Sequence, residues 1–193
     1  IRPEVAKSLQ AAQDALKAGQ LESALSLSQQ TLAMPGITEV EKPVIQRALA
    51  VAALQAKNFP LAIQTLEAMI QEMPEDTLAV QKLPLMEALL SASEQVKDLP
   101  RVVNWARIYL KLEGGNPSVR PVLIQTLFSL NRHEEVIQEV KEKIRLAEAG
   151  KVKTPESDLR TLAVSQRQVK DDAGYNSTLK MLLQNYPTKA YWA

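Results

Sequence analysis

Apolar side chains recur at three- and four-residue steps along most of the chain, most clearly between Ile45 and Pro74. This segment has an alanine- and leucine-rich half, a break at Lys57-Asn58-Phe59-Pro60, and a second amphipathic half. A period of three to four residues is typical of helices with one buried stripe. Asn58 can cap the second half, and Pro60 fits a first turn whose amides lack internal partners. The segment is therefore predicted to be a hairpin of two helices.

Weaker copies of this two-helix pattern occupy the rest of the chain. They are separated by turn or stop residues such as Gly19, Gly114-Gly115 and Tyr186-Pro187. A helix pair cannot cover its own apolar faces, so we expect the pairs to stack on one another. The sequence predicts a single domain over 1–193 with five hairpins, at about 3–36, 38–74, 77–115, 116–150 and 154–187.

Two local features refine these boundaries. Thr38-Glu39-Val40-Glu41 has the spacing of a capping box, which introduces the second hairpin. Pro84 lies inside the apolar pattern of the third hairpin, where proline removes a hydrogen bond and collides with the preceding turn. The helix is either kinked or starts late. We favour a start near Lys82, after a separate turn at 77–81.

Composition agrees with an all-α protein, because 46% of the 193 residues are hydrophobic, only 4% are aromatic and six are glycine. The 23 Lys and Arg residues against 22 Asp and Glu give a net charge of +1, too balanced for non-specific nucleic-acid binding.

Cysteine is absent, which excludes disulfides and permits an oxidising compartment. No apolar run approaches the roughly 18 residues of a membrane span. The chain starts without Met, so we expect that its start has been trimmed; removal of a signal peptide or anchor stays open.

Residues with catalytic or metal-binding chemistry are sparse. His133 is the only histidine and follows Asn131-Arg132 in a turn, where we interpret it as covering a hairpin end. Asp171-Asp172 precedes a helix and is interpreted as capping. No set of several metal ligands is visible. We therefore expect no catalytic residues, no metal and no cofactor, although an enzyme of unusual design stays an alternative.

The best hairpin resembles a tetratricopeptide repeat (TPR). Counted from Ala62, the family's signature positions fall on Leu49, Ala50, Ala53, Leu66, Met69 and Pro74. The family's usual Trp, Gly and Tyr are replaced by Gln46, Ala50 and Ala53, so the match is one of side-chain size plus the terminal proline. The resemblance implies a right-handed superhelical solenoid of about five TPR-like helix hairpins. The residues taken as equivalent to Ala62 are Ala24, Val102, Val136 and Gly174, with successive spacings of 38, 40, 34 and 38 residues.

The TPR register implies a concave surface formed by the first helix of each hairpin. The partner-binding residues expected there are Gln13, Arg47, Val51, Gln55, Glu87, Ser91, Gln95, Gln125, Phe128, Ser129 and Gln166, with Leu9, Leu16, Leu159 and Ala163 beside them. This lining lacks the Lys/Asn cluster by which chaperone-binding TPRs hold a terminal carboxylate. We expect a protein or peptide partner, bound through amide hydrogen bonds and shallow apolar contacts.

Aromatic residues offer few further sites. Trp105 and Tyr109 share one side of a helix and are interpreted as packing between neighbouring hairpins rather than as a binding surface. Trp192, beside Tyr191, either packs against the last hairpin or binds something outside the chain.

Both ends of the chain resemble a group of exported bacterial TPR proteins associated with TonB energy-transduction systems. The segments that carry this resemblance begin at Arg2-Pro3-Glu4-Val5 and at Tyr186-Pro187-Thr188-Lys189. This resemblance implies a periplasmic or secreted scaffold in a cell-envelope complex, with a cytoplasmic location as the alternative. Two other functions stay open. One is a nucleic-acid-binding solenoid that uses Arg101, Arg107, Lys111, Arg120 and Arg132. The other is a structural protein that self-associates through its terminal helices.

Overall fold

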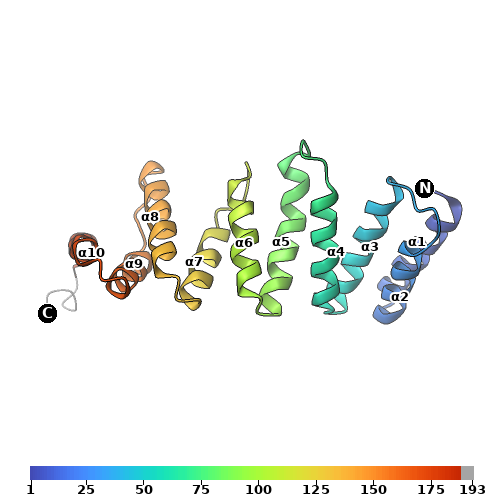
Figure 1. Ribbon diagram of the computed structural model, residues 1–193, viewed down its shortest axis with the longest axis horizontal. Helices are drawn as coiled ribbons and strands as arrows, with labels where there is room; N and C mark the ends of the chain where they lie inside the picture. The colour runs from blue at the N-terminus through green and yellow to red at the C-terminus, as the bar shows by residue number, and fades with distance from the viewer. Residues whose placement is uncertain (188–193) are drawn as a thin grey trace. The chain divides into compact units, whose positions relative to one another are not determined.

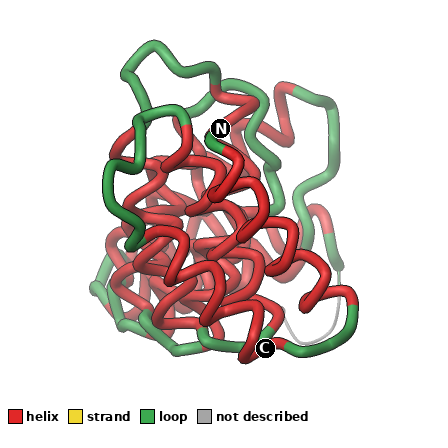
Figure 2. The backbone as a smooth tube through the Cα atoms, turned by 90° about the vertical axis from the view of Figure 1, so that its right-hand side faces the viewer, coloured by secondary structure: helices red, strands yellow, loops and turns green. Residues whose placement is uncertain are grey.

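The computed structural model describes residues 1–187, which form helices joined by short loops and contain no strand (Figures 1 and 2). The expected all-α fold of helix hairpins is confirmed. The helices are α1 (Pro3–Lys17), α2 (Leu21–Leu32), α3 (Glu41–Gln55), α4 (Phe59–Glu72), α5 (Ala79–Gln95), α6 (Leu99–Lys111), α7 (Val119–Ser129), α8 (His133–Ala149), α9 (Glu156–Gln168) and α10 (Asp172–Asn185).

These helices fall into two compact units, residues 1–115 and 116–193. Unit 1 contains α1 to α6, in which each helix packs against the next and α1 also contacts α3. Unit 2 contains α7 to α10, again with each helix packed against its successor. A single domain over 1–193 stays a prediction.

The turn inside every hairpin has one backbone design. The second-last residue before each second helix has a positive φ. These residues are Gly19, Lys57, Lys97, Asn131 and Lys170. The next amide then donates to a carbonyl five residues earlier, over 2.8 to 3.0 Å, as between Asn58 and Ala53. This pattern is the Schellman motif, which satisfies carbonyls that the helix end leaves unpaired. The same motif therefore sets the start of all five second helices.

Small side chains allow close packing in the first two hairpins. Ala24, Ala52, Ala53 and Ala62 are fully buried in one cluster with Leu49. Alanine lets helix axes approach closely, while the leucine supplies apolar area that is removed from water. The interior of unit 1 is therefore built where the sequence pattern placed alanines between facing helices.

The expected late start of the third hairpin is wrong. Helix α5 begins at Ala79, after Leu78 in an extended conformation, and Pro84 lies inside it. Proline at this position removes only the amide that would donate to the Val80 carbonyl. The helix tolerates one missing hydrogen bond near its start, so the segment 79–81 is helical rather than a separate turn.

The turn motif also corrects the register of the fifth hairpin. In each hairpin, the carbonyl of the residue after the positive-φ position accepts from the amide four residues later. In the first four hairpins this amide belongs to Ala24, Ala62, Val102 and Val136. In α10 it belongs to Tyr175. Tyr175, not Gly174, is therefore equivalent to Ala62, and the last spacing is 39 residues rather than 38. The expectation for Gly174 was wrong by one position because a small residue was taken as the marker.

The predicted caps are present. Asn58 Oδ1 accepts from the Leu61 amide at 3.3 Å, and Asp171 Oδ1 accepts from the Gly174 amide at 2.9 Å. In the capping box, Thr38 Oγ1 accepts from the Glu41 amide at 3.2 Å, and Glu41 Oε2 accepts from the Thr38 amide at 3.1 Å. These side chains satisfy amides that the helix starts leave free.

Candidate functional site

The exposed sides of the first helices hold most of the residues expected to bind a partner. We call them the first-helix faces: the solvent-exposed sides of α1, α3 and α5 in unit 1, and of α7 and α9 in unit 2. The expected residues that are exposed on these faces are Gln13, Arg47, Val51, Gln55, Glu87, Ser91, Gln95, Gln125, Phe128 and Ser129. Amide and hydroxyl groups predominate among them, beside apolar Val51 and Phe128, so the faces can offer hydrogen bonds and apolar contact.

Gln166 does not lie on a first-helix face. Its side chain is 1% exposed, and its Oε1 accepts from Thr178 Oγ1 at 2.8 Å. Leu159 and Ala163 of the same helix are also buried, and so is Leu9 of α1. In α9 the one-residue register error described above accounts for Leu159 and Ala163, whereas Gln166 lies two positions before the residue equivalent to Gln55, which is Gln168. The corrected register places exposed residues on the α9 face at Arg160, Val164, Arg167 and Gln168.

A groove lies between the first helices α3 and α5 of unit 1. It has a volume of about 620 Å³ and is lined by Arg47, Met73, Val80, Gln81, Pro84 and Leu85. Sequence reasoning identified only Arg47 among these residues. Val80 and Gln81 were missed because the segment 77–81 was taken as a turn. The available signal was apolar Val80 beside Pro84 at the start of a first helix.

A smaller groove lies between the first helices α7 and α9 of unit 2. Its volume is about 260 Å³, and α7 contributes Gln125 and Phe128, both expected from the sequence. Lys143 of α8 and Asp158 of α9 also line it and form an ion pair, with 2.7 Å between Lys143 Nζ and Asp158 Oδ2. The charges in this groove therefore neutralise each other, and the partly exposed Phe128 ring also lines it.

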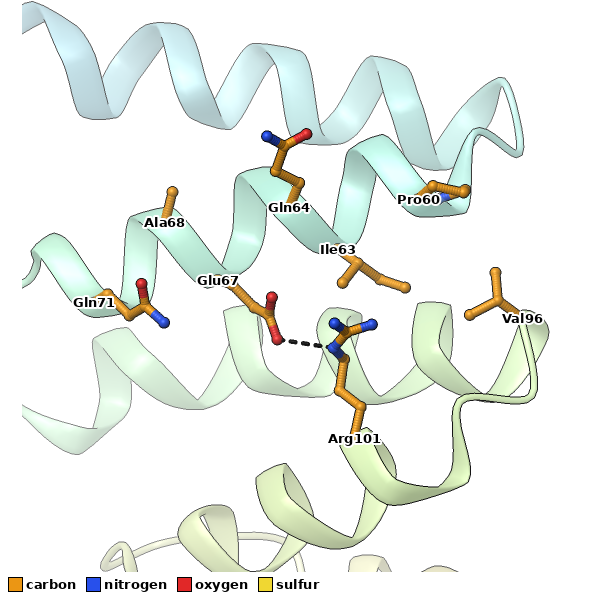
Figure 3. Close-up of a pocket in the computed structure, with 8 residues that line it drawn as sticks. All are labelled: Pro60, Ile63, Gln64, Glu67, Ala68, Gln71, Val96 and Arg101. Carbon is orange, nitrogen blue, oxygen red and sulfur yellow. Dashed lines mark hydrogen bonds and ion pairs between the residues drawn. The ribbon is translucent and has the colours of Figure 1, made fainter.

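A third groove, of about 580 Å³, lies between the second helices α4 and α6 of unit 1 (Figure 3). Arg101 and Glu67 face each other in it, with 3.0 Å between Arg101 Nε and Glu67 Oε1. The Arg101 guanidinium also contacts the Asp98 carboxylate. Both charged groups of this groove are therefore already engaged within the chain.

Trp105 and Tyr109 are buried, as the packing interpretation requires. Trp105 Nε1 donates to Glu67 Oε1 at 3.0 Å, which joins α6 to α4 of the preceding hairpin. The Tyr109 hydroxyl donates to the Glu87 carboxylate on the α5 face. The two rings therefore connect helices rather than form an exposed aromatic surface.

The basic residues considered for nucleic-acid binding are largely paired with acids. Arg101 contacts Glu67 and Asp98, and Arg120 forms an ion pair with Glu139. The adjacent Glu135 carboxylate raises the pKa of Arg132 and binds its guanidinium. Paired cations release few counterions on meeting a phosphate backbone, so these positions contribute little electrostatic affinity.

His133 packs at a hairpin end, as expected for a turn residue. Its ring meets the Phe128 ring edge to face, with 5.3 Å between centroids, and its Nδ1 lies 3.3 Å from Ser165 Oγ. Within residues 1–187, no group of three or more His, Asp or Glu side chains is arranged to hold a metal ion. In the same range, no helix has the length and apolar character to cross a membrane. The two interpretations of Trp192 concern a residue outside this range.

Comparison with known proteins relates the chain to others by fold. No family model matches it, and no curated protein matches its sequence. The structure of the MamA protein is similar with a TM-score of 0.57 and 12% identity, over 97% of this chain and 94% of that chain. The structure of YrrB, described as a TPR protein with an unusual peptide-binding site, is similar with a TM-score of 0.55 and 10% identity, over 95% of this chain and 87% of that chain. The structure of the apo form of RapI is similar with a TM-score of 0.55 and 13% identity, over 93% of this chain and 69% of that chain.

These identities are low, so the likeness concerns the arrangement of helices and not the residues of any site. The helix order, the five hairpins and the likeness to YrrB agree on one architecture. The chain has the fold of a TPR protein.

Proposed function

We propose that this protein is a non-catalytic scaffold that binds a protein or peptide on its first-helix faces. The observation that carries the proposal is the position of two grooves between successive first helices, α3 with α5 and α7 with α9. Each groove combines apolar side chains with amide groups, which suits extended or helical peptides. The peptide-binding site named for YrrB, a protein of the same fold, supports this choice.

We further propose a periplasmic location and a role in a cell-envelope complex, such as a TonB-type system. Support comes from the resemblance of both chain ends to exported bacterial TPR proteins. The absence of cysteine is compatible with an oxidising compartment. The partner is then another envelope protein rather than a small molecule.

Affinity capture from the source cell tests this function. The whole chain serves as bait beside a double variant, Val51→Glu with Phe128→Glu, which adds one charge to the first-helix faces of each unit, on α3 and on α7. Both side chains are partly exposed, at 41% and 37%, so the variant should keep its helical circular-dichroism spectrum. We expect envelope proteins with the unaltered bait and their loss with the variant. Equal capture by both baits would contradict binding through these faces.

A single-charge variant on a second helix controls for non-specific effects of added negative charge. Gln71→Glu adds a charge on the exposed α4 surface, outside the first-helix faces. It should capture the same partners as the unaltered chain. Loss of binding with Gln71→Glu as well would indicate that net charge, not the first-helix faces, controls capture.

A further inference from the structure

We infer that the α3/α5 groove of unit 1 binds an extended aliphatic peptide segment that carries one carboxylate, and that Arg47 binds this carboxylate. The inference rests on the proposed scaffold function and specifies the chemistry of its partner. Three features of the groove carry it: a single available cation, apolar walls, and a carbonyl that loses its helical donor to a proline.

Arg47 supplies the charge. It is exposed on α3 and is the only formally charged residue among the six that line the groove. Within residues 1–187, no ion pair engages its guanidinium, in contrast to Arg101 and Arg120. The α5 acid one turn along, Glu87, already accepts a hydrogen bond from the Tyr109 hydroxyl. A guanidinium matches a carboxylate with two parallel hydrogen bonds, so an acidic group is the complementary ligand.

Aliphatic side chains make up most of the groove walls. Met73, Val80, Pro84 and Leu85 line it, and Val80 is 69% exposed. Two further exposed aliphatics, Val51 and Leu78, belong to the same two first-helix segments. Monomeric proteins rarely gather large exposed aliphatics around one groove unless a partner covers them. Valine- or leucine-sized side chains of a partner would bury this surface.

Pro84 adds a backbone acceptor. Proline has no amide hydrogen, so the Val80 carbonyl, four residues earlier, lacks the donor that a regular helix would give it. Val80 and Pro84 both line the groove. A peptide amide can donate to this carbonyl while neighbouring aliphatic side chains contact the walls. An extended peptide offers such amides, whereas a helical one has used most of its own.

Fluorescence anisotropy with the whole chain tests the inference. The probes are labelled nine-residue peptides in which Val and Leu alternate with Ser and one position is Asp or Glu, beside a matched set with Asn or Gln there. We expect the acidic peptides to bind about tenfold more tightly than their amide counterparts, as for a charge-assisted hydrogen bond. Arg47→Gln should weaken the acidic peptides about tenfold and leave the amide peptides unchanged.

Two variants locate the site. Val80→Ser should weaken both peptide sets alike, because it removes wall area and no charge. Lys111→Gln removes a cation from the exposed end of α6, and binding should be unchanged. If acidic peptides bind but Arg47→Gln and Val80→Ser have no effect, the assignment of this groove is overturned while the scaffold function stands.

The remaining outcomes are equally decisive. If no peptide of either set binds, the aliphatic-acidic ligand class is wrong, and the capture experiment above judges the scaffold function separately. If light scattering shows a dimer that Val80→Ser converts to monomer, a second copy occupies the groove and the inference fails.

Discussion

At the scale of single residues, the hairpin turns depend on a left-handed backbone conformation. Only the first of the five turns uses glycine there, at Gly19, while Lys57, Lys97 and Lys170 adopt φ values of 55 to 59°. A side chain at positive φ costs roughly 1–2 kcal/mol because its Cβ crowds the following carbonyl. Lysine is thus less suited to this position than glycine.

Lys57→Gly should therefore stabilise the protein. Glycine relieves the strain but gains freedom in the unfolded chain, so we expect a net increase of about 0.5–1 kcal/mol in the free energy of unfolding. Urea denaturation followed by circular dichroism measures it. The reverse change, Gly19→Ala, meets no atom within 4 Å and should cost about 1 kcal/mol through the backbone alone. A loss of stability in Lys57→Gly would show that the lysine side chain has a contact that outweighs the strain.

Glu41 should make stability depend on pH. Its carboxylate is 2% exposed, forms an ion pair with Arg2, and accepts from the amides of Arg2 and Thr38. The Arg2 guanidinium, followed by these amides, lowers the pKa of Glu41 to about 2. A lowered folded-state pKa contributes stability above the unfolded value near 4.5, and this contribution disappears as pH falls towards 2.

Glu41→Gln tests that dependence. The variant should be less stable than the unaltered chain at pH 7, and the difference should shrink between about pH 4.5 and pH 2, where the wild-type carboxylate becomes protonated. Urea midpoints at pH 7 and pH 2.5 for both proteins provide the comparison. A difference that is the same at both pH values would contradict a stabilising role for the ionised carboxylate.

Residue patterns predicted the caps but not every register. Asn58, Asp171 and the Thr38–Glu41 pair could be identified because their hydrogen bonds are local, within three residues. The fifth hairpin was misaligned because Gly174 has the size expected at the buried position. Tyr175 can occupy that position in α10 because no later helix among residues 1–187 packs over it.

At the scale of elements, Pro84 is the main departure from regular structure. Pro84→Ala restores the amide that donates to the Val80 carbonyl and removes the clash with the preceding turn. We expect the free energy of unfolding to rise by about 1–3 kcal/mol, measured by urea denaturation. The helical circular-dichroism signal should be unchanged or slightly larger. Destabilisation would mean that the proline ring contributes packing that the backbone gain does not replace.

Sequence reasoning misplaced the start of α5 for a physical reason. Proline is unfavourable in a helix interior, so the local rule favoured a start near Lys82. Packing of α5 against α4 and α6 stabilises the helix beyond what local propensity gives. The early start then brings Val80 and Gln81 into the groove with Arg47. The same tertiary effect hid these two of the six groove residues from the sequence.

At the scale of the whole molecule, packing within each unit is mainly between helices adjacent in the chain, with α1 also contacting α3 in unit 1. Leu89 in unit 1 and Leu127 in unit 2 are both fully buried. Leu89→Ala and Leu127→Ala should each cost about 2–5 kcal/mol, because truncation leaves a cavity. Since contacts are local, amide hydrogen exchange should accelerate chiefly in the unit that carries the substitution. Equal acceleration in both units would show that 1–187 opens as one cooperative body.

The sequence by itself determined the helix hairpins, their number and most of their boundaries, because apolar period, caps and stop residues act over a few neighbouring positions. It also indicated the exposed sides of most first helices, for which Arg47 and Phe128 are examples. Only the tertiary structure decided the course of α5 through Pro84, the register of α10, the pairing of Arg101 with Glu67, and the grooves between first helices. Those features depend on contacts between segments tens of residues apart, where packing outweighs local preference.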